Sequence, residues 1–184
     1  MKCDGNMVRM YDFFDNFMFE ATARLYVKKL WGYDKKKPWY FAVEGIEGSG
    51  KTKFIKLLER AVKGAGKIPI TLQYEPMSFD IPEELKNPKN GDNWIISEKT
   101  FLTDYAYSDK LTEEDRNMGN MFLEDCIKDY NRGLWFINTP IRTARSRSKN
   151  PEYDEALQDA ALKKYRRIIN DEWFDWDVLV KVSV

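Results

Sequence analysis

The chain has 184 residues and a mass of 21.8 kDa, the size of one ordinary domain that buries a core without disulfide or metal staples. Its 30 basic and 30 acidic residues balance, whereas proteins that bind nucleic acid are usually basic overall. The absence of histidine excludes a histidine-based zinc site, a Ser-His-Asp triad and a Cys-His nucleophile.

The location expected from the sequence is cytoplasmic. Cys3 and Cys126 are typical of reduced thiols in an intracellular protein. No apolar run approaches the roughly 20 residues of a membrane span, and no secretory signal pattern opens the chain. We therefore expect no membrane partner, and a homodimer is an open alternative to a monomer.

Hydrophobic periodicity predicts helices and strands in alternation along the chain. The first element is an amphipathic helix over residues 8–31, whose apolar side carries Phe14, Phe17, Met18, Ala21 and Leu25. Short apolar runs predict strands at 39–43, 68–72, 94–96, 134–137 and 178–182, the first of them bounded by Pro38 and by glycines. The other predicted helices are 50–64, one starting near Asp104, 112–131, one with Pro140 in its first turn, and 155–171.

This alternation indicates the α/β class, with a parallel sheet covered by helices on both faces. We expect residues 1–37 to be an N-terminal helical extension and residues 38–184 to be the α/β domain itself, compact together as one unit.

The strongest motif is a phosphate-binding loop between a predicted strand and a predicted helix. Residues 45–52 read Gly-Ile-Glu-Gly-Ser-Gly-Lys-Thr, which satisfies the pattern G-x-x-x-x-G-K-[ST]. Glycines let backbone N–H groups turn toward phosphate oxygens at the positive end of a helix. The predicted nucleotide-binding residues are Gly45, Glu47, Gly48, Ser49, Gly50, Lys51 and Thr52, with Lys51 reaching the β- and γ-phosphates of ATP and the Thr52 hydroxyl ligating Mg²⁺.

The ends of the other strands argue against a motor or switch NTPase. Such proteins place an aspartate directly after an apolar strand to hold Mg²⁺ and activate water. Neither 94–97 nor 134–138 ends that way, and the nearest acid is Glu98. A small-molecule kinase is therefore favoured.

With its preceding glutamate, the loop at 44–52 resembles the P-loop of thymidylate kinases, E-G-[hydrophobic]-[D/E]-G-[A/S]-G-K-[S/T]. Residues 98–107 are similar to that family's D-R-[Y/H]-x-x-S-x-x-A-Y segment, with Glu-Lys-Thr in place of D-R-Y. Thr139-Pro140 and the arginines after it are similar to the family's strand end and arginine-bearing lid. The resemblance covers roughly residues 38–182 and implies that the 38–184 domain is a P-loop kinase domain.

The resemblance implies roles for further residues. Glu98 would help to place Mg²⁺ or the acceptor, and Lys99 would stand in for the arginine that holds the acceptor phosphate. Arg142, Arg145 and Arg147 would grip the transferring phosphoryl group, within a mobile lid over residues 141–156. A solvated helix face is the alternative for the three arginines. The implied reaction is transfer of the ATP γ-phosphate to a deoxynucleoside monophosphate.

Departures from the family leave the acceptor open. Tyr74-Glu75-Pro76-Met77 replaces the family's Arg-Glu-Pro-Gly, and the segment that faces the nucleobase is absent. Deoxynucleoside kinases also have a Glu-Pro at this point, and 98–104 fits their E-R-S-x-x-S-D pattern about as well. Glu75 either ends a strand or belongs to the site, where it would act as the base for a hydroxyl acceptor.

Three alternatives to the monophosphate kinase follow. The acceptor could be the 5′-hydroxyl of a deoxynucleoside, or a hydroxymethylated base in DNA, for which Lys35, Lys36, Lys37, Lys51, Lys53 and Lys56 could form a local basic patch. The chain could instead be a non-catalytic nucleotide-binding module. We also expect the N-terminal helix to pack beside the acceptor cleft with Arg24 facing it; covering the sheet edge is the alternative.

Overall fold

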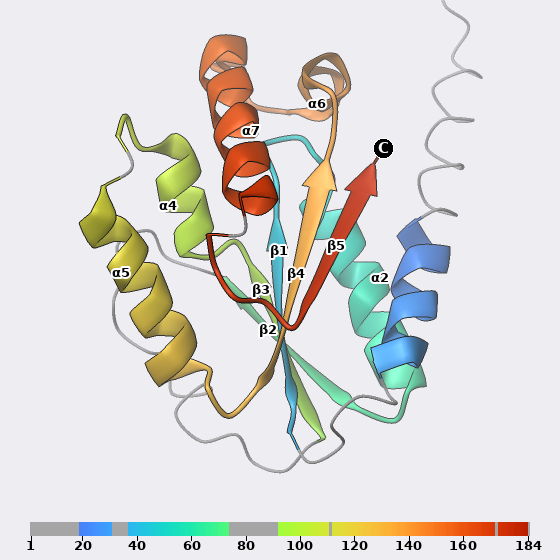
Figure 1. Cartoon of the computed structure of the whole chain (residues 1–184). Coiled ribbons are helices and arrows are strands. Elements are labelled where there is room, and N and C mark those ends of the chain that lie inside the picture. Colours follow the sequence, from blue (N-terminus) through green and yellow to red (C-terminus); the bar gives the residue numbers. More distant parts are fainter. Residues whose placement is uncertain (1–18, 31–36, 74–91, 111, 172, 184) are drawn as a thin grey trace, which may run out of the picture.

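The computed structural model describes residues 19–30, 37–73, 92–110, 112–171 and 173–183. Five parallel strands form one sheet in the order β2-β3-β1-β4-β5 (Figure 1). The strands are β1 (Trp39–Glu44), β2 (Ile68–Gln73), β3 (Asn93–Glu98), β4 (Asn131–Asn138) and β5 (Val178–Ser183). All five predicted strands are confirmed, and the fold is the expected α/β sheet.

The helices connect successive strands. They are α2 (Lys51–Gly64), α4 (Phe101–Tyr107), α5 (Glu113–Met121), α6 (Ile141–Arg147) and α7 (Glu155–Asn170), with a further unlabelled helix over residues 19–30. Thr112 caps α5 in a capping box with Asp115, as its position before three acidic residues predicts. The predicted helix 112–131 was too long, because α5 passes into a π-helical turn, η1 (Phe122–Cys126), before β4 begins.

Each face of the sheet carries its own apolar core. Successive residues of a strand point to opposite faces, so Tyr40 and Ala42 pack under α4, η1 and α7, whereas Trp39, Phe41 and Val43 pack under α2 and the 19–30 helix. Every residue of β1 is buried, as expected for the central strand of a parallel sheet covered on both faces.

The 19–30 helix lies beside α2 on the same face of the sheet (Figure 1). Its buried positions are Phe19, Ala23, Val27 and Leu30, and the Phe19 ring meets Phe54 of α2 edge-on at 5.4 Å. The prediction that Ala21 and Leu25 line the apolar side was wrong, because both are exposed; the buried stripe lies two residues further along. Phe14, Phe17 and Met18 lie outside the described residues.

None of the helices in the described ranges is long and apolar enough to cross a lipid bilayer.

Candidate active site

The carboxyl ends of the parallel strands meet at one edge of the sheet, and a cavity of about 1070 Å³ opens there. Elements far apart in the sequence contribute to it: the loop after β1, the turn after β3, α4, the end of α6 and α7. Its lining residues are Phe19, Gly45, Glu47, Gly48, Ser49, Gly50, Lys51, Thr52, Lys53, Glu98, Lys99, Thr103, Asp104, Tyr107, Arg147, Lys149 and Gln158. Every nucleotide-binding residue predicted from the motif therefore lines one cavity.

The phosphate loop connects β1 to the start of α2 and lies against α6. Gly48 has φ +75°, and a Cβ there would stand 2.1 Å from the Ala144 carbonyl oxygen of α6, so no other residue fits. Gly50 is the N-cap of α2 and offers no side-chain cap, which leaves the N–H groups of the first turn available to an anion. The buried Ser49 hydroxyl has no hydrogen-bond partner in the described part of the chain. These unsatisfied donors fit the phosphates of a nucleotide.

Lys51 is almost fully buried, with its side chain folded into the loop. Its ammonium donates to the carbonyl oxygens of Gly45 and Ile46, at 2.7 and 2.9 Å. Burial lowers the pKa of Lys51 from 10.5 to about 8, and the negative charge of Glu44 opposes that shift. The loop encloses the stem of Lys51, so this residue is packed as well as charged.

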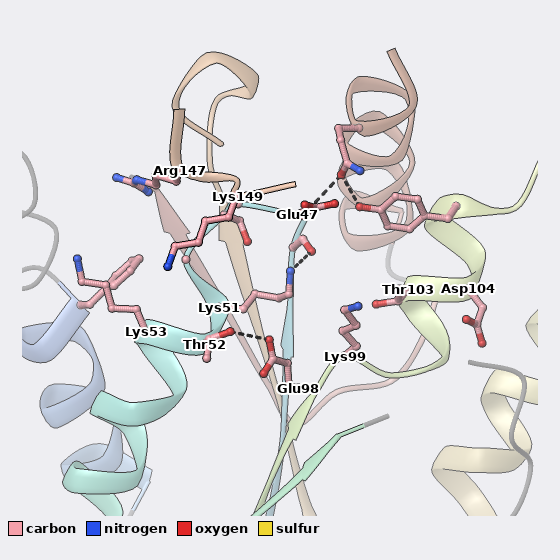
Figure 2. A pocket seen from close by; sticks show the side chains of 17 residues that line it. Glu47, Lys51, Thr52, Lys53, Glu98, Lys99, Thr103, Asp104, Arg147 and Lys149 are labelled. Carbon is pink, nitrogen blue, oxygen red and sulfur yellow. Dashed lines mark hydrogen bonds between the residues drawn. The ribbon is translucent and has the colours of Figure 1, made fainter. Parts of the chain in front are cut away.

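Thr52 and Glu98 lie side by side in the lining of the cavity. The Thr52 hydroxyl donates to Glu98 Oε1 at 2.9 Å, although 46 residues separate the two along the chain (Figure 2). Glu98 ends β3, next to β1, and this adjacency brings the pair together. The described residues contain no group of three or more acidic or cysteine side chains that would hold a metal alone. A hydroxyl and a carboxylate do fit Mg²⁺, which keeps several waters and takes phosphate oxygens as ligands.

The buried carboxylate of Glu44, behind the phosphate loop, was not predicted from the sequence as a site residue. Glu44 is completely buried at the end of β1 and accepts hydrogen bonds from Thr100 (2.6 Å), Thr103 (2.8 Å) and Tyr165 (2.9 Å). Burial raises the pKa of Glu44, and the three hydroxyls with the Lys51 charge counteract part of that rise. The network ties the phosphate loop to α4 and α7. Its sequence signal was the glutamate that precedes the phosphate loop, but nothing local indicated the three hydroxyl donors.

Lys99 occupies a strained position between β3 and α4. Its φ of +70° lies in the left-handed region, which is rare for residues other than glycine and is often found at functional sites. The turn is held by the Lys99 N–H, which donates to Val43 O at 3.1 Å, and by the Ser97 hydroxyl, which donates to Lys99 O at 2.7 Å. Figure 2 shows Lys99, Thr103 and Asp104 on one side of Lys51, with Lys53, Arg147 and Lys149 on the other.

Glu47 joins the phosphate loop to the segment predicted as a lid. Its carboxylate accepts from the Ser148 hydroxyl at 2.7 Å and the Asn150 amide at 3.4 Å. Ala144 is fully buried and Tyr153 nearly so, which gives this polar segment more apolar anchoring than expected. Whether residues 141–156 move remains a prediction.

The three predicted lid arginines do different things. Arg147 lines the cavity. Arg145 instead pairs with Glu155 at 3.9 Å and lies over the Tyr153 ring, and Arg142 is exposed and does not line the cavity. The spacing of Arg142 and Arg145 along α6 places both side chains on the side of this helix that faces away from the phosphate loop. Glu75 falls outside the described residues, so its role stays a prediction.

Arg24 does not face the acceptor side. Its side chain is 73% exposed and pairs with Glu20, one turn earlier in the helix, at 2.5 Å. Because the buried stripe runs through Phe19 and Ala23, Arg24 points to solvent, and Phe19 is the residue of this helix that lines the cavity. The prediction for Arg24 was therefore wrong.

Tyr107 and Gln158 were also missed as lining residues. The Gln158 side-chain oxygen accepts from the Glu47 N–H at 3.1 Å and from the Tyr107 hydroxyl at 2.5 Å (Figure 2). Burial raises the pKa of Tyr107 to about 12, so it remains a neutral donor. Only the packing of α7 against α4 brings them to the loop, so no local pattern reveals Gln158.

No protein-family model matches the sequence, and no curated protein does. Among solved structures, a protein assigned as polyphosphate kinase 2 from Pseudomonas aeruginosa PA01 is similar with a TM-score of 0.60 and 14% identity; the match covers 100% of this chain and 41% of that one. A deoxyadenosine kinase from M. mycoides, with the products dCMP and a flexible dCDP bound, is similar with a TM-score of 0.46 and 17% identity, over 77% of this chain and 88% of that one. Neither is a thymidylate kinase. The likeness to the first structure shows that this chain has the α/β fold of P-loop kinases.

Proposed function

We propose that the chain is an ATP-dependent phosphotransferase whose acceptor is a deoxynucleoside monophosphate. The observation that carries the proposal is one cavity in which the phosphate loop, the Thr52–Glu98 pair and Lys99 converge. Five of the eight charged residues that line this cavity are cations, an excess that suits two anionic substrates. They are Lys51, Lys53, Lys99, Arg147 and Lys149.

In this proposal the protein positions the substrates and neutralises charge, without a covalent intermediate. The N–H groups at the start of α2 and the Lys51 ammonium hold the β- and γ-phosphates, with Arg147 beside them. Thr52 and Glu98 would hold Mg²⁺, which when bound would offset the negative charge of the phosphates. An oxygen of the acceptor phosphate forms a bond to the γ-phosphorus of ATP. The bond between the γ-phosphorus and the β–γ bridging oxygen breaks at the same time, and ADP leaves with that oxygen.

A hydroxyl acceptor is the second candidate, and Asp104 is the observation that favours it. This carboxylate lines the cavity on the same side as Lys99. A hydroxyl must lose its proton as it attacks, so a carboxylate within reach assists a nucleoside or a hydroxymethylated base. A monophosphate needs no base, and a carboxylate close to its phosphate would repel it.

A phosphotransfer screen tests the proposal. Purified protein with ATP and Mg²⁺ is offered deoxynucleosides, their monophosphates and hydroxymethylated oligonucleotides, and ADP formation is followed. We expect acceptor-dependent ADP with one or more monophosphates. Turnover of nucleosides or oligonucleotides alone would favour the second candidate, and nucleotide binding without steady ADP production would favour a non-catalytic module.

Substitutions separate the two enzyme candidates further. For a monophosphate kinase, Lys99→Met should raise acceptor KM strongly, whereas Asp104→Asn and Glu75→Gln should keep most of kcat. A fall in kcat of about 10²-fold or more in either carboxylate variant is typical of a lost general base and would favour a hydroxyl acceptor.

A further inference from the structure

The zero net charge of the chain conceals two oppositely charged faces. On the 19–30 helix and α2, seven of the nine exposed or half-exposed charged residues are cations. We call these seven the basic face: Arg24, Lys28, Lys29, Lys53, Lys56, Arg60 and Lys63. Between residues 104 and 129, across α4, α5 and η1, eight of eleven charged residues are acidic. Figure 1 shows these helices on opposite sides of the sheet, which the two separate cores confirm.

Most of the cations on the basic face are not paired with an acidic side chain of the described residues. Arg24 pairs with Glu20, and the other acid of the two helices, Glu59, accepts a hydrogen bond from Thr71. Lys28, Lys56, Arg60 and Lys63 form no ion pair with the described residues. Side chains of one sign held on two adjacent rigid helices create a lasting positive potential.

The basic face reaches the mouth of the cavity. Lys53 belongs to both, and Phe19, at the start of the neighbouring helix, also lines the cavity. Across the mouth, the Arg147 guanidinium lies 3.9 Å from the point that a Cβ on Gly50 would occupy, close to the Phe19 ring. Cations thus lie both on the outer helices and beside the phosphate loop, where Figure 2 shows Lys53, Arg147 and Lys149.

We propose that the basic face binds the phosphate backbone of a nucleic acid and holds it beside the mouth of the cavity. A backbone presents regularly spaced phosphates, which suits cations spread along two helices. A lipid surface fits less well, because the apolar stripe through Ala23, Val27 and Leu30 is buried against the sheet and cannot insert into a membrane. The basic patch predicted from sequence shares only Lys53 and Lys56 with this face. Lys51 is buried, and Lys37 lies before β1, at the opposite end of the sheet from the phosphate loop. Lys35 and Lys36 lie outside the described residues.

The test measures binding of fluorescein-labelled 20-nucleotide DNA, single-stranded and duplex, by anisotropy at several salt concentrations. With about five phosphates neutralised, affinity should fall about 10²- to 10³-fold between 50 and 200 mM salt. In Lys56→Glu/Arg60→Glu the slope of log Kd against log salt should decrease by about 2. Lys56→Gln/Arg60→Gln, which keeps helix-forming side chains, should decrease it by a similar amount.

The matched control is Lys110→Glu/Lys128→Glu, which changes the net charge equally on the opposite, acidic side. It should leave the slope unchanged. Binding of a fluorescent ATP analogue should persist in all three variants, because none of the altered residues lines the cavity. This readout keeps the test independent of the proposed phosphotransfer.

Three results would overturn the proposal. The first is absence of DNA binding at 50 mM salt, and the second is an equal loss in the control. The third is stronger binding to vesicles containing 30% phosphatidylserine than to DNA, which would assign the face to a membrane.

Discussion

The Lys51 ammonium is held by two carbonyl oxygens of the loop in which it lies, and this contact determines how a substitution there must be designed. Replacement by alanine would leave a void as well as remove the charge, so methionine is the better choice because it keeps the stem. Lys51→Met should lower phosphotransfer by about 10²- to 10³-fold or more, as loss of a preorganised charge does.

Lys53→Met is its matched control. Lys53 is half-exposed at the rim of the same cavity, two positions along α2. The Lys53→Met variant should lose far less activity than Lys51→Met in the same steady-state assay. The melting temperatures of both variants are recorded to check that both are folded. Equal activities in the two variants would contradict the assignment of Lys51 to the transferring phosphates.

Burial lowers the pKa of Lys51, and the nearby Glu44 carboxylate opposes that shift, so both affect the pH dependence of the site. Lys51 has a pKa of about 8, so its ammonium, and with it the affinity for ATP, should be lost as the pH rises through about 8. The Glu44 carboxylate favours the charged form, so Glu44→Gln should lower this pKa and shift the loss of affinity to lower pH.

The measurement is the Kd of a fluorescent ATP analogue between pH 6 and 10. Tyr165→Phe is the control, because it removes one hydrogen bond to Glu44 but keeps the carboxylate and its other two donors. Its profile should follow that of the unmodified protein. Superimposable profiles for all three proteins would show that Glu44 has no electrostatic effect on the loop.

At the scale of elements, the phosphate loop and α6 are packed as one unit through Gly48. Gly48→Ala would place a methyl group against the Ala144 carbonyl and force the loop and α6 apart. Gly66→Ala is a control of nearly identical backbone strain, since its φ is +73° and no atom lies within 4 Å of the added Cβ.

Both variants should lose about 1–2 kcal/mol of stability from the left-handed backbone. Only Gly48→Ala should lose more than that and bind the ATP analogue more weakly. Denaturant unfolding and nucleotide titration measure the two effects. Unchanged affinity in Gly48→Ala would mean that contact with α6 does not shape the nucleotide site.

At the scale of the whole molecule, the 19–30 helix contributes to the same core as α2 and the sheet. Leu30 and Leu25 lie in this helix, but Leu30 is 6% exposed and Leu25 is 54% exposed. Leu30→Ala should therefore cost about 2–5 kcal/mol of the free energy of unfolding, whereas Leu25→Ala should change it by less than about 0.5 kcal/mol. Denaturant unfolding checks both, and equal values would show that the helix is not part of the cooperative unit.

Local sequence determined the strands, most of the helices and the phosphate loop, because each depends on neighbouring residues. Alternating apolar runs give strands, Thr112 and its acidic neighbours start α5, and the glycines of 45–50 meet backbone angles that other residues reach only with strain. For the same reason, Thr52 and Glu98 could be assigned from their motifs before their contact was known.

Only the tertiary structure decided which side chains surround that loop. The side of a helix that is buried depends on its partner, which is why Arg24 points to solvent and Arg147, rather than Arg142 or Arg145, lines the cavity. The Glu44 network and Gln158 join residues more than 50 positions apart, and no local pattern encodes such contacts. The separation of charge could not be predicted from the composition either, because the net charge only sums all charges. The fold places the basic and the acidic helices on opposite faces of the sheet.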